Sequence, residues 1–165
     1  KNELYNNVFL YTETDFQKEQ IKSINSLSKK ISERIYVKLP PFNINESNTY
    51  IYEELKNTKI KFLNKKYNVD HYLKEFKYAY TLDNGTIFLE LIGLNYPCFL
   101  INKKFCKFNN QFKKELANLK KINIVFDTIE EFSIFLNKTD LDLFWKKTQK
   151  KKNIFKISKK LLFFK

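Results

Sequence analysis

The stretch Leu89-Glu90-Leu91-Ile92-Gly93-Leu94-Asn95-Tyr96 decides the fold that we predict for this chain. Its apolar side chains, which follow the turn signal Asp83-Asn84-Gly85, predict a strand from about residue 86 to residue 94. The chain has only two glycines, Gly85 and Gly93, so we expect both to serve as structural turn residues. At Gly93 we expect a positive φ or the close approach of another backbone or a nucleic-acid strand.

On the C-terminal side of this stretch, the pattern predicts more strands and then a helix. We expect strands within residues 98–108, 122–126 and 132–136, with a polar and partly helical connection over residues 111–121. A helix from about residue 140 places Leu141, Phe144 and Trp145 on one face. Acidic residues in its first turn and lysines in its last agree with the helix dipole.

On the N-terminal side, the pattern is mixed. Apolar residues at helical spacing predict a helix over residues 15–34, and alternation predicts strands at 35–39 and 58–63. Residues 50–55 and 69–80 fit either helix or strand. The fold class that follows is α+β, with two small domains that each pack an antiparallel-type sheet on a helix. We place these domains at residues 1–83 and 84–150, followed by a basic C-terminal tail at 151–165.

The charge of the chain is high and uneven. The formal net charge is +13, and residues 1–83 hold 14 basic and 11 acidic side chains, whereas residues 84–165 hold 17 and 7. A chain whose basic charge gathers in one half has the electrostatic pattern of a polyanion binder. A solvated lysine surface that serves only solubility is the simpler alternative.

The basic residues form three groups. Residues 146–160 hold eight lysines and no acid. Two further groups lie upstream, and the second group is Lys103, Lys104 and Lys107. The third group is Lys113, Lys114, Lys120 and Lys121. Lysines this dense repel one another in water, whereas a phosphate backbone neutralises them and releases counterions. We predict RNA binding by Lys103, Lys104, Lys107, Lys146, Lys147, Lys150, Lys151, Lys152, Lys156, Lys159 and Lys160.

Other side chains are less informative about function. Phe155, Phe163 and Phe164 are candidates for stacking on unpaired bases, with burial against a neighbour as the alternative. Two cysteines and a single histidine cannot supply a four-ligand zinc set, and we expect buried free thiols and a structural or surface histidine. No phosphate-binding glycine loop or nucleophile elbow occurs. We therefore expect no enzyme, no metal, no cofactor, no small-molecule substrate and no transmembrane segment.

The amino-acid composition indicates the kind of genome that encodes the chain. Gly, Ala, Arg and Pro together make only 8 of 165 residues, which is typical of an extremely A+T-rich coding sequence. Many organelle genomes have such coding sequences. This bias also explains why all but one of the 31 basic residues are lysine.

Residues 84–150 resemble the sixth large-subunit ribosomal protein family of the bacterial and organellar type. The family has a strand of the form Leu-x-Leu-Val-Gly-Val-Gly-Tyr, and residues 89–96 fit it with Asn95 in place of the second glycine. Asn also tolerates a left-handed conformation. Residues 132–136, the turn at 137–140 and the helix that follows fit the rest of the series, but the family's glycine- and lysine-rich loop is missing.

The resemblance implies a function and a location. It implies a structural constituent of the large ribosomal subunit that binds rRNA near the translation-factor site, with neighbouring ribosomal proteins as further partners. The A+T-rich composition then implies a mitochondrial ribosome in the matrix and an organelle-encoded chain. Two alternatives stay open. One is another ribosomal protein such as the fifth large-subunit protein, and the other is a lineage-specific accessory subunit of an organelle membrane complex.

Overall fold

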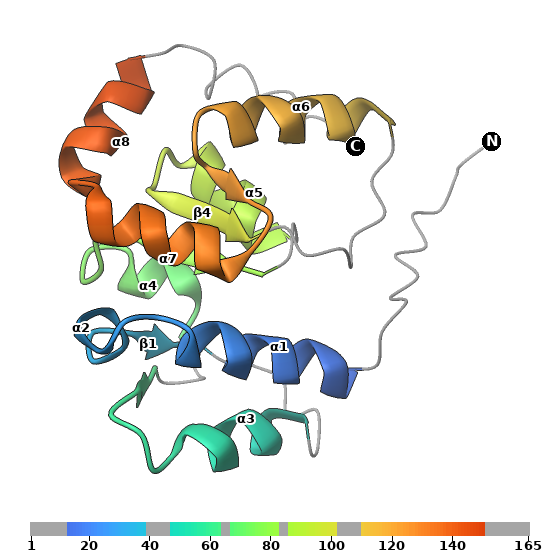
Figure 1. Cartoon of the computed structure of the whole chain (residues 1–165), viewed down its shortest axis with the longest axis vertical. Helices are drawn as coiled ribbons and strands as arrows, with labels where there is room; N and C mark the ends of the chain where they lie inside the picture. Colours follow the sequence, from blue (N-terminus) through green and yellow to red (C-terminus); the bar gives the residue numbers. More distant parts are fainter. Residues whose placement is uncertain (1–12, 39–46, 64–66, 83–85, 102–109, 151–165) are drawn as a thin grey trace.

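The computed structural model describes residues 13–38, 47–63, 67–82, 86–101 and 110–150 (Figure 1). Its helices are α1 (Glu13–Asn25), α2 (Lys29–Ser32), α3 (Ser47–Leu55), α4 (Val69–Tyr72), α5 (Thr86–Gly93), α6 (Asn110–Lys121), α7 (Ile129–Lys138) and α8 (Leu141–Lys150). Its strands are β1 (Tyr36–Val37), β2 (Lys61–Phe62), β3 (Ala79–Thr81), β4 (Cys98–Ile101) and β5 (Val125–Phe126). The α+β class is confirmed.

The strands form two small parallel sheets. One sheet pairs β1 with β2, and the other has the order β3-β4-β5 with Ala79 beside Cys98 and Leu100 beside Val125. The prediction of antiparallel-type sheets was therefore wrong. Parallel neighbours need a crossover rather than a tight turn. Helix α5 supplies the crossover between β3 and β4, and α6 supplies the one between β4 and β5.

The strand predicted from about residue 86 to residue 94 was wrong, because residues 86–93, which form the first crossover, are a helix. Phe88, Leu91 and Ile92 are buried, whereas Ile87, Glu90 and Leu94 are exposed. Burial at i, i+3 and i+4 is the period of a helix that packs by one face. The nearly continuous apolar composition of the run concealed this period.

Residues 132–136, which we predicted as a strand, are the centre of helix α7. The helix begins with a capping interaction, in which the backbone N–H of Glu131 donates to Thr128 Oγ1 at 3.1 Å. The Glu131 carboxylate accepts in turn from the backbone N–H of Asp127 at 3.1 Å. This pair resembles a capping box, and its Thr-x-x-Glu signature was visible in the sequence. The predicted strands around β1, β2, β4 and β5, the helical connection at α6 and the helix at α8 are confirmed.

Strand β4 is the centre of the larger core, because all four of its residues are buried. On one face, the Phe99 ring contacts the rings of Phe126, Phe132, Phe135, Phe144 and Trp145, which come mainly from α7 and α8. Helix α7 crosses in front of this sheet in Figure 1. The opposite face carries Cys98 and Leu100, because successive residues of a strand alternate between faces. Helices α5 and α6 contact the sheet as consecutive crossovers in the order β3-β4-β5, and right-handed crossovers in one direction lie on one face. Helices thus cover the parallel sheet on both faces, as such sheets require.

A second, smaller core lies around the two-stranded sheet. It consists of Ile24 from α1 and Ile51 and Leu55 from α3, with Ile60 and Phe62 among the residues packed against it. Helix α1 and the turn after it join the two cores, because Ile24 on α1 belongs to the smaller cluster and Leu27, two residues after the helix, belongs to the larger one. Strand β3 precedes residue 83 and yet pairs with β4, so the larger sheet begins before the boundary that we predicted. The division into two domains stays a prediction.

The two helices that serve as crossovers end in the same way. The N–H of Tyr96 donates to Leu91 O and that of Asn95 to Ile92 O, which is a Schellman motif with Asn95 at its left-handed position. Asn123 has the same place after α6, and the φ angles of the two residues are 59° and 56°. Gly93 has no positive φ and is the last residue of α5, so a positive φ at this residue was a wrong prediction, whereas the close approach of another backbone or a nucleic-acid strand stays a prediction. Asparagine takes the role that glycine usually has in this motif.

Candidate nucleic-acid interface

Helix α6 has one apolar face and one basic face. Leu116 and Leu119 are buried in the larger core. From residue 113 onward, the exposed positions of the helix are Lys113, Lys114, Ala117, Lys120 and Lys121. The spacing of these five positions places them on one side of the helix, so the sequence dictates a face of four lysines around a single small residue. We call this surface the α6 basic face.

The lysines of the α6 basic face are largely uncompensated. Lys120 forms an ion pair with Asp127. Among the residues that the structure describes, Lys113, Lys114 and Lys121 take part in no ion pair. From Lys113 to Lys121 the face extends about 12 Å along the helix axis. Three free ammonium groups at this spacing attract a polyanion more strongly than a single surface charge does.

Helix α8 contributes the second basic surface. Lys146 and Lys147 are exposed, and Lys150 is the last residue of the helix. The other end of α8 is fixed by Asp142, which accepts hydrogen bonds from Tyr78 Oη at 2.7 Å and from Lys77 Nζ at 3.0 Å. These donors hold the pKa of the Asp142 carboxyl below its usual range, with the Tyr78 hydroxyl as the largest cause. The lysine end of α8 and helix α6 both lie at the end of the molecule that is farthest from α3 (Figure 1).

The remaining predicted binding residues lie outside the described residues. They are Lys103, Lys104, Lys107, Lys151, Lys152, Lys156, Lys159 and Lys160, together with the predicted turn residue Gly85 and the three phenylalanines proposed for stacking. Of the lysines that we predicted to bind RNA, the structure therefore places Lys146, Lys147 and the backbone of Lys150 on one helix. The lysines of the α6 basic face are the third lysine group of the sequence. The pair Lys113 and Lys114 recurs seven residues later as Lys120 and Lys121, and this spacing already indicated a single helical face.

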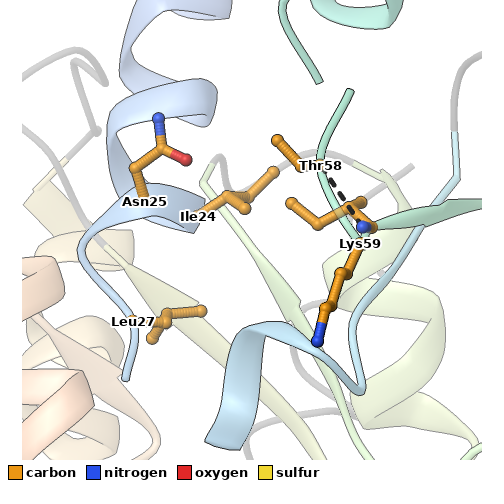
Figure 2. Close-up of a pocket in the computed structure, with 6 residues that line it drawn as sticks. Ile24, Asn25, Leu27, Thr58 and Lys59 are labelled. Carbon is orange, nitrogen blue, oxygen red and sulfur yellow. Dashed lines mark hydrogen bonds between the residues drawn. The ribbon is translucent and has the colours of Figure 1, made fainter. Parts of the chain in front are cut away.

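A hollow between α1 and the turn before β2 has a volume of about 200 Å³ (Figure 2). Ile24 and Leu27 form apolar lining, and Asn25, Thr58 and Lys59 contribute polar groups. The polar groups of the turn have internal partners, because Thr58 Oγ1 accepts from the Ile60 N–H at 3.2 Å and Lys59 pairs with Glu33 at 2.9 Å. The arrangement contributes mainly to local structure.

Among the described residues, the cysteine and the potential metal ligands give no second type of site. Cys98 is a free cysteine within the core, and its burial raises the pKa of the thiol far above its ordinary value, so the group is protonated and inert. No group of three or more potential metal ligands occurs within the described ranges. Over the same ranges, no helix is both long enough and apolar enough to span a bilayer.

Comparison with known proteins does not add to this description. No protein-family model matches the chain, and no curated protein or solved structure matches it.

Proposed function

We propose that this chain is an RNA-binding structural protein of a mitochondrial large ribosomal subunit. The observation that carries the proposal is the α6 basic face, where three lysines without an acidic partner surround Ala117. The exposed lysines at the end of α8 add to the charge at the same end of the molecule (Figure 1). The ribosomal and mitochondrial parts of the proposal rest on the resemblance and on the A+T-rich composition.

The exposed side chains of α6 favour contact with the phosphate backbone. The described outer positions of this helix carry ammonium groups and one methyl group, with no ring for stacking on a base. Lysine binds phosphate as a compact point charge without the fork geometry of arginine. Such contacts position a protein on RNA without reading its sequence. We therefore propose that the α6 basic face lies along the backbone of an rRNA helix.

The proposal does not depend on one ribosomal protein family. The resemblance to the sixth large-subunit protein rested on residues 89–96 as a strand, and these residues include most of helix α5. The larger sheet is also parallel. A position near the translation-factor site thus stays a prediction from the resemblance, whereas RNA binding rests on the lysines themselves.

A second candidate function is that of an accessory subunit held in an organelle complex by protein contacts. The observation that favours it is a set of exposed aliphatic side chains on α5, α7 and α8 and directly after α5. Leu94 is 60% exposed and Ile134 is 55% exposed, and Ile87 and Leu143 are exposed as well. Such side chains suit contact with protein, so a test of the main proposal must separate charge from apolar contact.

A pair of charge reversals provides that test. Lys114→Glu with Lys121→Glu changes the α6 basic face, and Lys18→Glu with Lys22→Glu makes the same change in net charge on the exposed side of α1. We expect the α6 pair to weaken binding of the full chain to large-subunit rRNA far more than the α1 pair does. For the unaltered chain, affinity should fall with salt at a log–log slope of roughly −0.7 to −0.9 per phosphate contacted.

Sedimentation from an organelle lysate completes the test. Co-migration of the chain with large ribosomal subunits, lost after RNase treatment and reduced in the α6 pair, is the expected result. Equal effects of the two variant pairs on rRNA affinity would refute the α6 basic face as the binding surface. Migration with a membrane complex, unchanged by RNase, would favour the second candidate.

A further inference from the structure

A row of aromatic rings lies on the part of the chain before residue 82, away from the α6 basic face. Neighbouring ring centroids along it are 4.3 to 6.3 Å apart. The rings come from β1, from α4 and from the residues beside α4. We call the row the aromatic strip, and in order its members are Tyr36, Phe76, Tyr72, His71 and Tyr67.

At one end of the aromatic strip two exposed rings form a parallel stack. The centroids of Tyr67 and His71 are 4.3 Å apart, and the angle between the ring planes is 15°. Tyr67 is 42% exposed, and His71 is exposed as well. Tyr72 beneath them is buried and meets both rings at steep angles of 79° and 89°, so it supports the pair without joining the stack.

The sequence explains why these rings meet. Asn68 is the N-cap of α4, so Tyr67 precedes the cap and Tyr72 is the fourth residue after it. An apolar pair at these two positions is a hydrophobic staple that fixes the angle at which the chain enters a helix. The staple accounts for Tyr67 and Tyr72. It does not require the additional parallel contact with His71 at the surface.

The other end of the aromatic strip carries a positive charge. Tyr36 is 39% exposed and contacts the Phe76 ring with a centroid distance of 4.8 Å. Lys61 Nζ lies 5.4 Å from the centroid of the Tyr36 ring and 3.4 Å from its hydroxyl oxygen. Rings for stacking and an ammonium group for phosphate are the combination found in proteins that bind single-stranded nucleic acid.

The exposed apolar side chains of the two halves differ in kind. Among the described residues up to 82, the large exposed hydrophobic side chains are all tyrosines, namely Tyr36, Tyr52 and Tyr67. In the described part of the chain after residue 82, the large exposed hydrophobic side chains are aliphatic and lie on α5, α7 and α8 or directly after α5. A flat ring with a polar edge suits a nucleobase, which presents a π-face and polar edges. An apolar protein partner would suit the aliphatic surface better.

The aromatic strip leads toward the lysines of α8. Residues Lys77 and Tyr78 directly follow Phe76, and both bond to Asp142 in the first turn of α8. Lys146 lies one helical turn further, about 6 Å along the axis. Helices α4 and α8 lie on the same side of the molecule in Figure 1. A single strand whose bases contact the rings can therefore continue along exposed lysines.

From this arrangement we infer that the aromatic strip binds unpaired nucleobases of a single-stranded RNA segment, with Tyr67 and His71 as the stacking pair. The inference rests on the proposed function, because it takes RNA as the partner. It adds a second mode of contact to that function. The α6 basic face binds the backbone of paired RNA, and the aromatic strip binds bases that are not paired.

The test compares a single-stranded oligoadenylate of roughly ten nucleotides with an RNA duplex of the same length. Binding of the full chain is measured by fluorescence anisotropy. The variant Tyr67→Leu with His71→Leu removes both rings and keeps apolar bulk, and Tyr67→Phe with His71→Phe keeps two rings. Tyr52→Leu is the control, because Tyr52 is a tyrosine of similar exposure, 48%, outside the aromatic strip.

We expect the double leucine variant to bind the single strand about tenfold more weakly and the duplex unchanged. The double phenylalanine variant and the Tyr52 control should bind the single strand like the unaltered chain. Unchanged single-strand affinity of the double leucine variant would overturn the inference, and so would an equal loss for the duplex. If the unaltered chain bound neither RNA at low salt, the proposed function itself would fail.

A measurement on the unaltered chain removes any dependence on how the variants fold. Photocrosslinking to a single strand that contains 4-thiouridine, followed by mass spectrometry, identifies the peptides in contact with bases. Crosslinks within residues 67–76 are expected. Crosslinks confined to α6 and α8 would contradict the role of the aromatic strip and leave the proposed function in place.

Discussion

The two sheets of this protein differ in how completely they are enclosed. The three-stranded sheet has helices on both faces, and every residue of its central strand β4 is buried. In the two-stranded sheet the first residue of each strand, Tyr36 and Lys61, is exposed. The larger sheet can therefore be stable through its own core. The smaller one depends on α1, and Leu27, two residues after that helix, belongs to the larger core.

The largest effect that this comparison predicts is at Phe99. Its side chain is 1% exposed and contacts five aromatic rings. Phe99→Ala should lower the free energy of unfolding by about 3–5 kcal/mol, measured by urea denaturation, because it leaves a cavity between β4 and two helices. Leu143→Ala, at a side chain that is 49% exposed on α8, should change it by less than about 0.5 kcal/mol. Similar losses for both variants would show that the larger core is not the centre of stability.

The next largest loss of stability is expected in the smaller core. Leu55 is fully buried there, and Leu55→Ala should cost about 2–5 kcal/mol of local stability. The comparison predicts that faster hydrogen exchange appears in α3 and β2, whereas the amides of β4 keep their protection. Glu54→Ala, at an exposed position next to Leu55 on α3, is the control. Equal acceleration in β4 would mean that the two cores unfold as one unit.

The sequence predicted the elements that have a clear period of their own. The helix at α8 could be read from Leu141, Phe144 and Trp145, since a stripe on one side is unambiguous. Residues 89–96 could not be read in this way, because apolar residues occupy both the buried and the exposed positions of α5. A fully buried strand and a helix in an apolar environment then have the same composition. The assignment also affected the predicted strand direction, because a strand at residues 86–94 removes the crossover that the parallel pair β3 and β4 needs.

The two candidate binding surfaces also differ in how far the sequence predicts them. The lysines of α6 are neighbours in sequence, so their shared face follows from helical spacing alone. The aromatic strip joins Tyr36 to residues 67–76 across a separation of at least 31 positions, and only the fold brings these rings together. His71, which we expected to be a structural or surface histidine, enters the proposed base contact only because its ring stacks on that of Tyr67.

A smaller effect on stability should appear at the end of α5, beside the three-stranded sheet. Asn95 has a φ of 59°, and its Oδ1 is a buried atom without a hydrogen-bond partner in the described structure. Asn95→Ala should lower the melting temperature and cost about 1 kcal/mol, because a Cβ without a polar group disfavours the left-handed conformation. Asn95→Gly should keep or raise stability. Gly93→Ala is the control with no positive φ, and a loss there as large as that of Asn95→Ala would contradict the assignment of the motif.

The smallest effect concerns the link between the segment after α4 and helix α8. The Tyr78 hydroxyl and the Lys77 ammonium group hold the pKa of Asp142 below its ordinary value of 3.8. A lowered pKa in the folded chain contributes stability that is present above pH 3.8 and is lost as the pH falls through the folded value. The contribution should be small, because the side chains of Asp142 and Lys77 are 55% and 72% exposed.

Tyr78→Phe removes the largest cause of the shift in the pKa of Asp142, so the melting temperature of this variant should fall less steeply below pH 3.8 than that of the unaltered chain. Tyr52→Phe removes a hydroxyl far from Asp142 and should leave the slope unchanged, whereas identical slopes for Tyr78→Phe and the unaltered chain would show that this link does not stabilise the fold.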